Sequence, residues 1–359
     1  MKINNRTFKK NKINIIILLF LMLFVSTACI STPGLSSADS PIKYGFWPGN
    51  IDPSSYQPNW GKLTHVAYAS WDVNRDGSLN APYNINRFYA VRDLAHQHRV
   101  KVIIMVVSDT PKDMDYILAY HQKEFINNVL NKLQTTGADG VNIDWEEPNA
   151  INSYTQTSNT VLFEQLMKTL YIKLKTVNPN YHISFDTSSV IMKVHENKNL
   201  SKYIDSVFLM DYNMGRRQGI IGPNSPMFSP SKYDVRNSVN TLINIGYDER
   251  KIILGVPFFG YDHTTVAGTK PGVGPLNYTM IDMKTAISNS GIYGRHWDLE
   301  SQTPWYSYKS LSTYHQIWYD DEESLRIKYN YSKDKNLGGI GFLALGFEGN
   351  NAAVWNVFN

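Results

Sequence analysis

Short runs of β-branched and aromatic residues alternate with segments of helical period from Ile42 to the end of the chain, and this alternation restricts the possible folds most. Strands that alternate with helices pair in parallel, because each helix returns the chain to the same edge of the sheet. Eight runs have the length and composition of buried strands: Ile42–Trp47, Thr64–Ser70, Lys101–Val107, Gly140–Asp144, His182–Thr187, Ser206–Asp211, Lys251–Val256 and Gly338–Leu345.

Apolar residues between these runs recur at helical spacing. They include three sets: Phe88, Val91, Leu94 and Ala95; Phe125, Val129, Leu130 and Leu133; and Phe163, Leu166, Leu170 and Leu174. Eight strands with intervening helices predict an α/β chain folded as a (β/α)8 TIM barrel, whose active site lies at the carboxyl ends of the strands.

One interval is too long for a single barrel unit. About 80 residues separate Val256 from Gly338, where the other units take roughly 20 to 45. Residues 261–319 are rich in Gly, Tyr, Trp and Thr and show little helical periodicity. We therefore expect a small β-rich insertion after strand 7, over the mouth of the barrel; the alternative, a long disordered loop, is disfavoured by the many Tyr and Trp residues.

The N-terminus has the pattern of a secretory signal peptide, which we assign to residues 1–28. Five basic residues precede an apolar run from Ile13 to Val25, which is shorter than the roughly 20 residues of a membrane-spanning helix. Cys29 follows Ala28 and resembles the lipidated cysteine of a bacterial lipobox, although Ser26 stands where Leu is usual. We expect an exported, extracytoplasmic protein, anchored to the membrane by lipid on Cys29 or otherwise secreted, with a tether over 29–40 and the barrel over 41–359.

The positive charge of the chain belongs to this export signal. The formal net charge is +4, and residues 1–28 hold five basic and no acidic residues, so the remainder sums to −1. No cluster of Lys and Arg with interleaved aromatic residues follows, which makes nucleic acid a poor candidate partner.

The fourth predicted strand ends in acids that share a face. Side chains alternate along a strand, so Asn142, Asp144 and Glu146 project to one side, into the barrel or its mouth. Gathering carboxylates there costs free energy unless they are protonated or hydrogen-bonded. The pattern favours catalysis, with a structural acid pair or a cation site as alternatives. Asp320 and Asp321 precede the last predicted helix and suit its dipole rather than any chemistry.

The segment Asp139 to Glu146 resembles the D-G-x-D-x-D-x-E signature of glycoside hydrolase family 18, the chitinase family. Other parts of the chain carry the same resemblance, which spans essentially residues 42–358: Tyr44-Gly45-Phe46-Trp47, Thr64 to Ser70, Met210-Asp211-Tyr212-Asn213, Gly255 to Gly260, Tyr319-Asp320-Asp321 with Ser324, and Gly338-Gly339.

The resemblance implies roles for three catalytic residues. Glu146 would be the general acid, with a raised pKa; Asp144 would stabilise a positive oxazolinium intermediate; and Tyr212 would orient the acetamido carbonyl. The N-acetyl oxygen of the substrate then acts as nucleophile, and the configuration is retained without a cofactor or metal. We expect further substrate contacts from Asn142, Asn213, Tyr44, Trp71 and Trp297.

The chain also departs from the family pattern. Asn142 replaces the second Asp of the signature, Asn213 replaces an Asp, Glu147 stands where Tyr is common, the strand-three motif reads Met105 to Ser108, and Leu343 replaces a Trp. An Asn cannot hold a proton, so we expect the Asn142 amide to donate to Asp144 and to favour its ionised form.

The resemblance implies hydrolysis of β-1,4-linked N-acetylglucosamine glycans, either chitin or chitooligosaccharides. One alternative is a peptidoglycan N-acetylglucosaminidase, whose sequences the Asn142 signature also resembles. The other is a glycan-binding lectin on an inactive barrel, although such relatives typically lose the equivalent of Glu146.

Overall fold

The computed structural model describes residues 41–359 except 147, 189, 192, 218, 219, 271, 275 and 276. Residues 41–359 form one compact unit. The predicted signal peptide, Cys29 and the tether lie outside the described residues, as does Glu147.

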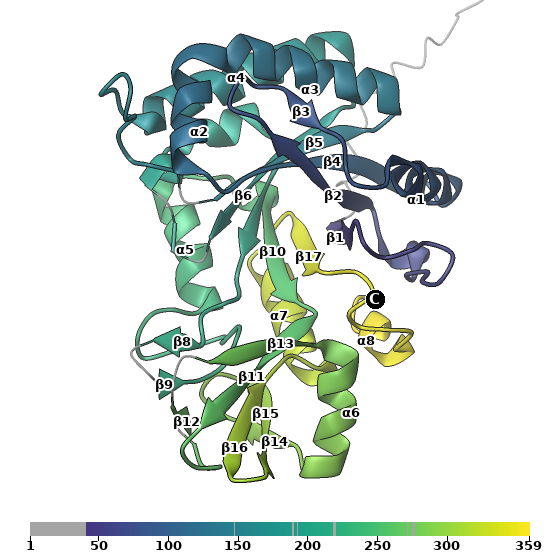
Figure 1. Cartoon of the computed structure of the whole chain (residues 1–359), viewed down its shortest axis with the longest axis vertical. Helices are drawn as coiled ribbons and strands as arrows, with labels where there is room; N and C mark the ends of the chain where they lie inside the picture. Colours follow the sequence, from purple (N-terminus) through teal and green to yellow (C-terminus); the bar gives the residue numbers. More distant parts are fainter. Residues whose placement is uncertain are drawn as a thin grey trace, which may run out of the picture. The chain divides into compact units, whose positions relative to one another are not determined.

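Eight parallel strands close into a barrel at the centre of this unit, which confirms the predicted fold class. β1 pairs with both β2 and β17, the first and last neighbours in the ring, so no edge of the eight-stranded sheet is left open. The strands are β1 Ile42–Pro48, β2 His65–Val73, β4 Lys101–Ser108, β5 Gly140–Trp145, β6 His182–Ser188, β7 Ser206–Met210, β10 Ile252–Pro257 and β17 Gly339–Leu343 (Figure 1). The two-residue β3, Leu79–Asn80, extends the end of β2.

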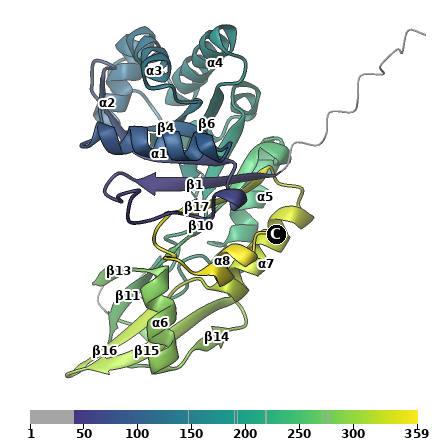
Figure 2. The same ribbon diagram turned by 90° about the vertical axis from the view of Figure 1, so that its right-hand side faces the viewer.

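Helices follow the strands and cover the outside of the barrel, as the two views in Figures 1 and 2 show. They are α1 Ile85–Gln97, α2 Pro111–Tyr116, α3 Gln122–Thr136, α4 Asn159–Val177, α5 Val235–Ile245, α7 Glu322–Asp334 and α8 Ala352–Asn356. Gly246 ends α5 with φ of 106°, a left-handed conformation that side chains other than glycine's rarely adopt.

The two faces of the strands pack into separate cores. On β5, Val141, Ile143 and Trp145 point outward and are buried among the helices; the Trp145 ring lies 5.3 Å from that of Phe125 on α3. The residues between them point inward, where a second cluster fills the barrel. Period-two alternation thus places the apolar residues of β5 against the helices and its polar residues inside the barrel.

The expected insertion after the seventh strand is present. Its five-stranded antiparallel sheet has the order β13-β11-β16-β15-β14. The elements of the insertion are β11 Phe259–Thr265, β12 Gly272–Val273, β13 Tyr278–Asp282, α6 Met283–Tyr293, β14 His296–Asp298, β15 Thr303–Ser310 and β16 Thr313–Trp318. A separate small sheet is formed by β12, which pairs with β9 Ile220–Ile221, and by β8 Arg216–Arg217, which pairs with β9 on its other side. The helix α6 was not predicted.

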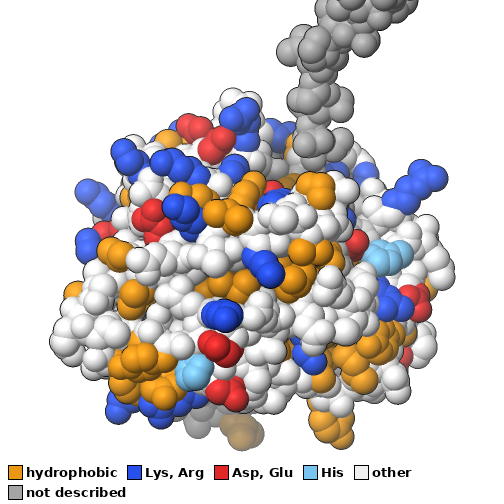
Figure 3. Space-filling view, turned by 90° about the horizontal axis from the view of Figure 1, so that it is seen from above, with side chains coloured by type: hydrophobic (Ala, Val, Ile, Leu, Met, Phe, Trp, Pro, Cys, Tyr) orange, Lys and Arg blue, Asp and Glu red, His pale blue; other side chains and the backbone are white. Residues whose placement is uncertain are grey.

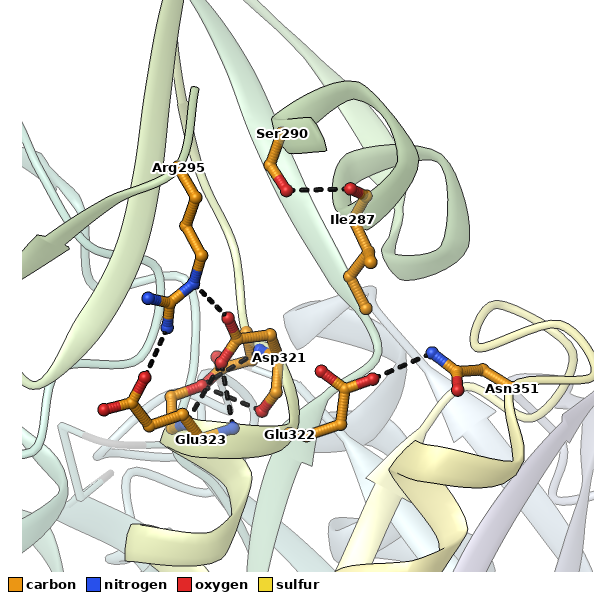
Figure 4. Close-up of polar contacts among 9 residues, drawn as sticks. Ile287, Ser290, Arg295, Asp321, Glu322, Glu323 and Asn351 are labelled. Carbon is orange, nitrogen blue, oxygen red and sulfur yellow. Dashed lines mark hydrogen bonds and ion pairs between the residues drawn. The ribbon is translucent and has the colours of Figure 1, made fainter. Parts of the chain in front are cut away.

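Polar contacts join the insertion to the last helices of the barrel (Figure 4). Arg295, in the loop after α6, donates from Nε to Asp321 at 2.7 Å and from a terminal nitrogen to Glu323 at 2.8 Å. Asp321 also caps α7, accepting hydrogen bonds from the N–H groups of Glu323 and Ser324, as expected for an acid at a helix start. A further hydrogen bond joins the last two helices to each other: Glu322, at the start of α7, accepts from Asn351, just before α8.

Charged side chains of both signs are interspersed with hydrophobic ones on the face shown in Figure 3. Among the helices that the structure describes, none combines the length and the hydropathy needed to cross a bilayer.

Candidate active site

The predicted acids of β5 lie along the inner face of the barrel and become more exposed toward its mouth. Asn142 is completely buried, Asp144 is 5% exposed, and Glu146 is exposed just beyond the end of the strand. The N–H of Glu146 donates to the carbonyl oxygen of Ser108 on β4 at 3.0 Å, which continues the parallel ladder by one residue. The sheet therefore holds the backbone of Glu146, while its carboxyl reaches solvent.

Tyr212 lies beside these acids. It follows β7, is 5% exposed, and packs its ring against Phe259 at a centroid distance of 5.7 Å. Burial raises the pKa of the Tyr212 hydroxyl well above its usual value, and the nearby charges of Asp186, Asp144 and Glu146 raise it further. The hydroxyl therefore stays protonated and able to donate. The structure thus brings together Glu146, Asp144 and Tyr212, the three residues that the resemblance identified.

A fourth polar residue of this site, Asp186 on β6, was not among the residues predicted from the sequence. Its side chain is 2% exposed and points into the barrel. Strand β6 alternates His182, Ser184 and Asp186 with the apolar Ile183 and Phe185. This is the same period-two signal that identified the acids of β5, and applied to β6 it would have predicted Asp186 as an interior residue.

Asn142 contacts Asp186 rather than Asp144, so the expected hydrogen bond was wrong. Its Nδ2 donates to Ser184 Oγ at 3.0 Å and to Asp186 Oδ1 at 2.7 Å. Burial and, less strongly, the charge of Glu146 raise the pKa of Asp144 to about 7, whereas we expected a donor amide to lower it. The physical reason is that the Asn142 amide points across to the adjacent strand β6, where Asp186 lies, instead of along β5 toward Asp144.

Three of the predicted substrate contacts are inaccessible. Asn142 is enclosed by β6, and Tyr44 is completely buried inside the barrel with its hydroxyl 3.4 Å from Ser184 Oγ. Trp71 is completely buried on the outer side of β2, where its ring packs on Phe88 of α1 at 4.9 Å. All three side chains are enclosed by the protein in this structure, and their contact with a sugar stays a prediction.

The other two predicted contacts are at least partly exposed. Asn213 is exposed next to Tyr212 with φ of 64°, and Tyr261 on β11 donates to its Oδ1 at 2.6 Å. Trp297 is half-buried on β14, the strand at one edge of the insertion sheet, and the Arg295 guanidinium lies 5.0 Å from its ring centroid. Asn213 therefore stays a predicted substrate contact beside the acids, and Trp297 a predicted contact on the insertion.

The site consists of acids, amides and a phenol. Across the described part of the chain, no group of three His, Cys, Asp or Glu side chains is arranged to hold a metal ion.

Comparisons with known proteins give the following matches. The model of the family described as glycosyl hydrolases family 18 matches residues 43–348. A probable di-N-acetylchitobiase of Dictyostelium discoideum is 27% identical over 270 residues, covering 65% of this chain and 66% of the relative. The human di-N-acetylchitobiase is 24% identical over 63% of each chain. A cortical fragment-lytic enzyme of Bacillus anthracis is 22% identical over 79% of this chain and 65% of its own.

These matches span no more than about two thirds of each of these relatives. Solved structures resemble the fold more completely. A chitinase of Rhizomucor miehei has a TM-score of 0.77 at 21% identity, covering 88% of this chain and 98% of its own. A spore cortex-lytic enzyme of Bacillus megaterium has a TM-score of 0.74 at 19% identity, covering 89% of this chain and 73% of its own.

Proposed function

The chain belongs to family 18 of the glycosyl hydrolases, and from this membership we propose that it cleaves β-1,4-linked N-acetylglucosamine glycans with retention of configuration. The observation that carries the proposal is the grouping of an exposed carboxyl, a buried carboxyl and a protonated phenol at the carboxyl ends of β5 and β7. Chitin or chitooligosaccharides are the proposed substrates.

Each group has a part in the proposed first step. Glu146, the exposed residue just beyond the end of β5, gives its proton to the glycosidic oxygen as the bond from that oxygen to the anomeric carbon breaks. The acetamido oxygen of the substrate forms the new bond to the anomeric carbon, which produces an oxazolinium ion. Asp144 carries the negative charge that stabilises this cation, and the Tyr212 hydroxyl donates to the acetamido group.

The second step uses the same residues in reverse. Glu146, now ionised, takes a proton from water as the water oxygen attacks the anomeric carbon. The bond between that carbon and the acetamido oxygen breaks, and the sugar leaves with its original configuration. Glu146 is protonated again, so the cycle closes without another reactant.

Replacing Glu146 by Gln tests the proposed acid. The amide has the same volume but no proton to donate, so activity on an unactivated chitooligosaccharide should fall at least about 10²–10⁴-fold without unfolding. Glu124→Gln is the matched control, because this side chain is half exposed (51%) on α3 and should leave the rate unchanged. Activity of Glu146→Gln within about tenfold of the wild type would reject the assignment.

The order of the two steps predicts the anomer of the product. Proton NMR during early turnover should show the β anomer first, before mutarotation. Formation of the α anomer first, or efficient cleavage of a glycan that lacks the 2-acetamido group, would contradict substrate-assisted retention.

Peptidoglycan is the second candidate substrate. It is favoured by the similarity to the cortical fragment-lytic enzyme and to the spore cortex-lytic enzyme, whose names place their activity on the spore cortex. Digesting chitooligosaccharides and purified peptidoglycan in parallel, with the products identified by mass, distinguishes the two substrates.

A further inference from the structure

Asp144 and Asp186 occupy neighbouring positions on adjacent strands. The register of β5 and β6 pairs Asn142 with Ser184 and Ile143 with Phe185, so the next pair along the two strands is Asp144 and Asp186. Paired strands lie about 4.8 Å apart, and both side chains point into the barrel. The two carboxyls therefore lie side by side across the ladder.

No opposite charge compensates for this pair among the described residues that act on it. Asp144 is 5% and Asp186 2% exposed, and Asp144 Oδ1 is buried without a hydrogen-bond partner. Glu146, a further acid, faces the pair from the end of β5, and the hydroxyls of Tyr44 and Tyr212 face it from β1 and from the segment after β7.

Neither acid has a charged residue paired with it on its other neighbouring strand. The residue paired with Asp144 on β4 is Val107, and the residue paired with Asp186 on β7 is Phe208. Two ionised carboxylates side by side, buried and without a cation, are unfavourable by both desolvation and repulsion. Both effects raise the pKa of Asp186, burial being the larger.

We propose that Asp186 replaces the acid that position 142 lacks: Asp144 and Asp186 hold one proton between them, and Asn142 orients Asp186 through the hydrogen bond to its Oδ1. Asp186 is then a positioning residue that acts through Asp144. The part that this pair takes in hydrolysis rests on the proposed function, whereas the shared proton does not.

The geometry explains how an Asn is tolerated in the signature. Asn142 donates both hydrogens of its amide, one to Ser184 and one to Asp186, and it holds the Asp186 carboxyl beside Asp144. The protonated oxygen of Asp186 is the donor that the buried Asp144 Oδ1 lacks. The family pattern places this acid at position 142, two residues before Asp144 on β5. In this chain the acid is Asp186, which lies opposite Asp144 on β6.

A titration of the free protein tests the shared proton directly. The full chain is labelled with 13C at the aspartate carboxyl carbons and carries Glu146→Gln, which removes the third acid. We expect the Asp144 signal to move in two steps between about pH 3 and pH 10, because it senses its own ionisation and that of Asp186. A single step would overturn the proposal. The measurement uses only the Glu146→Gln protein, so it does not depend on whether any other variant folds.

Three additional variants in the same background locate the second step. Asp186→Asn should leave one step, and Asn142→Asp combined with Asp186→Asn should restore two by returning the acid to β5. Ser184→Ala is the matched control: it also removes one hydrogen bond of Asn142 but no acid, and should keep both steps. Two steps that persist in Asp186→Asn would refute the pairing.

The pH dependence of kcat/KM connects the pair to catalysis. With Glu146 present, Asp186→Asn should lose one ionisation from the profile, the double variant should regain it, and Ser184→Ala should keep the wild-type shape. If the wild type cleaves no N-acetylglucosamine glycan, the proposed function fails while the titration still decides the shared proton. Superimposable profiles of the wild type and Asp186→Asn would show that the pair has no part in turnover.

Discussion

Glu348 illustrates at the scale of one residue how burial controls the charge of a carboxyl in this protein. Its side chain is completely buried after β17, where its two oxygens accept hydrogen bonds from the Tyr56 hydroxyl and from the N–H of Gly346. Burial raises the pKa of Glu348 from 4.5 to about 7, although these hydrogen bonds oppose the shift. The folded protein therefore keeps this carboxyl protonated under conditions in which the unfolded chain ionises it.

Glu348→Gln should consequently change how stability depends on pH. As the pH rises from about 4.5 to about 7, the unfolded wild type loses this proton while the folded state retains it. The free energy of unfolding of the wild type therefore falls over that window and does not fall further on this account at higher pH. The amide does not titrate, so the variant should gain up to about 3 kcal/mol relative to the wild type across the window.

Unfolding in urea at the two pH limits measures this difference. A free-energy difference for Glu348→Gln that is the same at both limits would contradict the prediction.

The sequence was sufficient to predict Asp144 and Glu146 as residues on one face, because strand alternation is a local property. It was not sufficient for the contacts between strands. The partner of Asn142 depends on the register of β5 against β6, and so does the neighbour of Asp144. The inaccessibility of Trp71 likewise depends on which face of β2 the helix α1 covers.

At the scale of elements, a completely buried ion pair joins α7 to the segment that precedes it. Lys328 on α7 bonds Asp320, which precedes the helix, and Ser324 donates to the same Asp320 oxygen at 2.7 Å. The charge of Lys328 also acts on the buried Asp211. Asp320 was expected only to suit the helix dipole, so its role as the partner of a buried lysine is a finding of the structure.

Lys328→Met should destabilise the protein by about 3–5 kcal/mol, because it leaves the buried Asp320 without its counter-ion. Combining Lys328→Met with Asp320→Asn should recover part of that loss. Lys333→Met is the matched control on the exposed side of the same helix and should cost less than about 1 kcal/mol. Denaturant unfolding gives these values, and a loss for Lys328→Met no larger than for Lys333→Met would refute the pair's importance.

Elements were predictable to the extent that they repeat a regular period. All eight barrel strands overlap their predicted ranges, since buried strands are short, continuous and apolar. The helix α6 was missed because only Met283, Ala286 and Ser290 of it are buried, which is too sparse a set to stand out as an apolar stripe.

At the scale of the whole molecule, the export and anchoring of the chain stay predictions. Cys29 follows the predicted signal peptide and is the only cysteine of the sequence. We propose that a diacylglycerol on Cys29 holds the protein at the membrane surface, because two acyl chains suffice for stable attachment where one is marginal.

Cys29→Ala should then move the protein from the membrane fraction to the soluble fraction. Ser31→Ala, two residues along the expected tether, is the control and should leave the distribution unchanged. Fractionation followed by detection of the protein in each fraction checks this, and a Cys29→Ala protein that still sediments with membranes would exclude the lipid anchor.

The closure of the barrel by β1 and β17 has a consequence for the order of folding. The first strand finds one of its two neighbours only when the last one has been made, and Lys43 donates to the carbonyl of Phe358 across a sequence separation of 315 residues. Contacts this distant form slowly, because a long loop must be ordered before they stabilise anything. Until β17 arrives, the sheet has two unpaired edges, β1 and β10, which offer free backbone groups to other chains. A chain interrupted before Gly339 would keep both edges, so it would be prone to aggregate with its own copies.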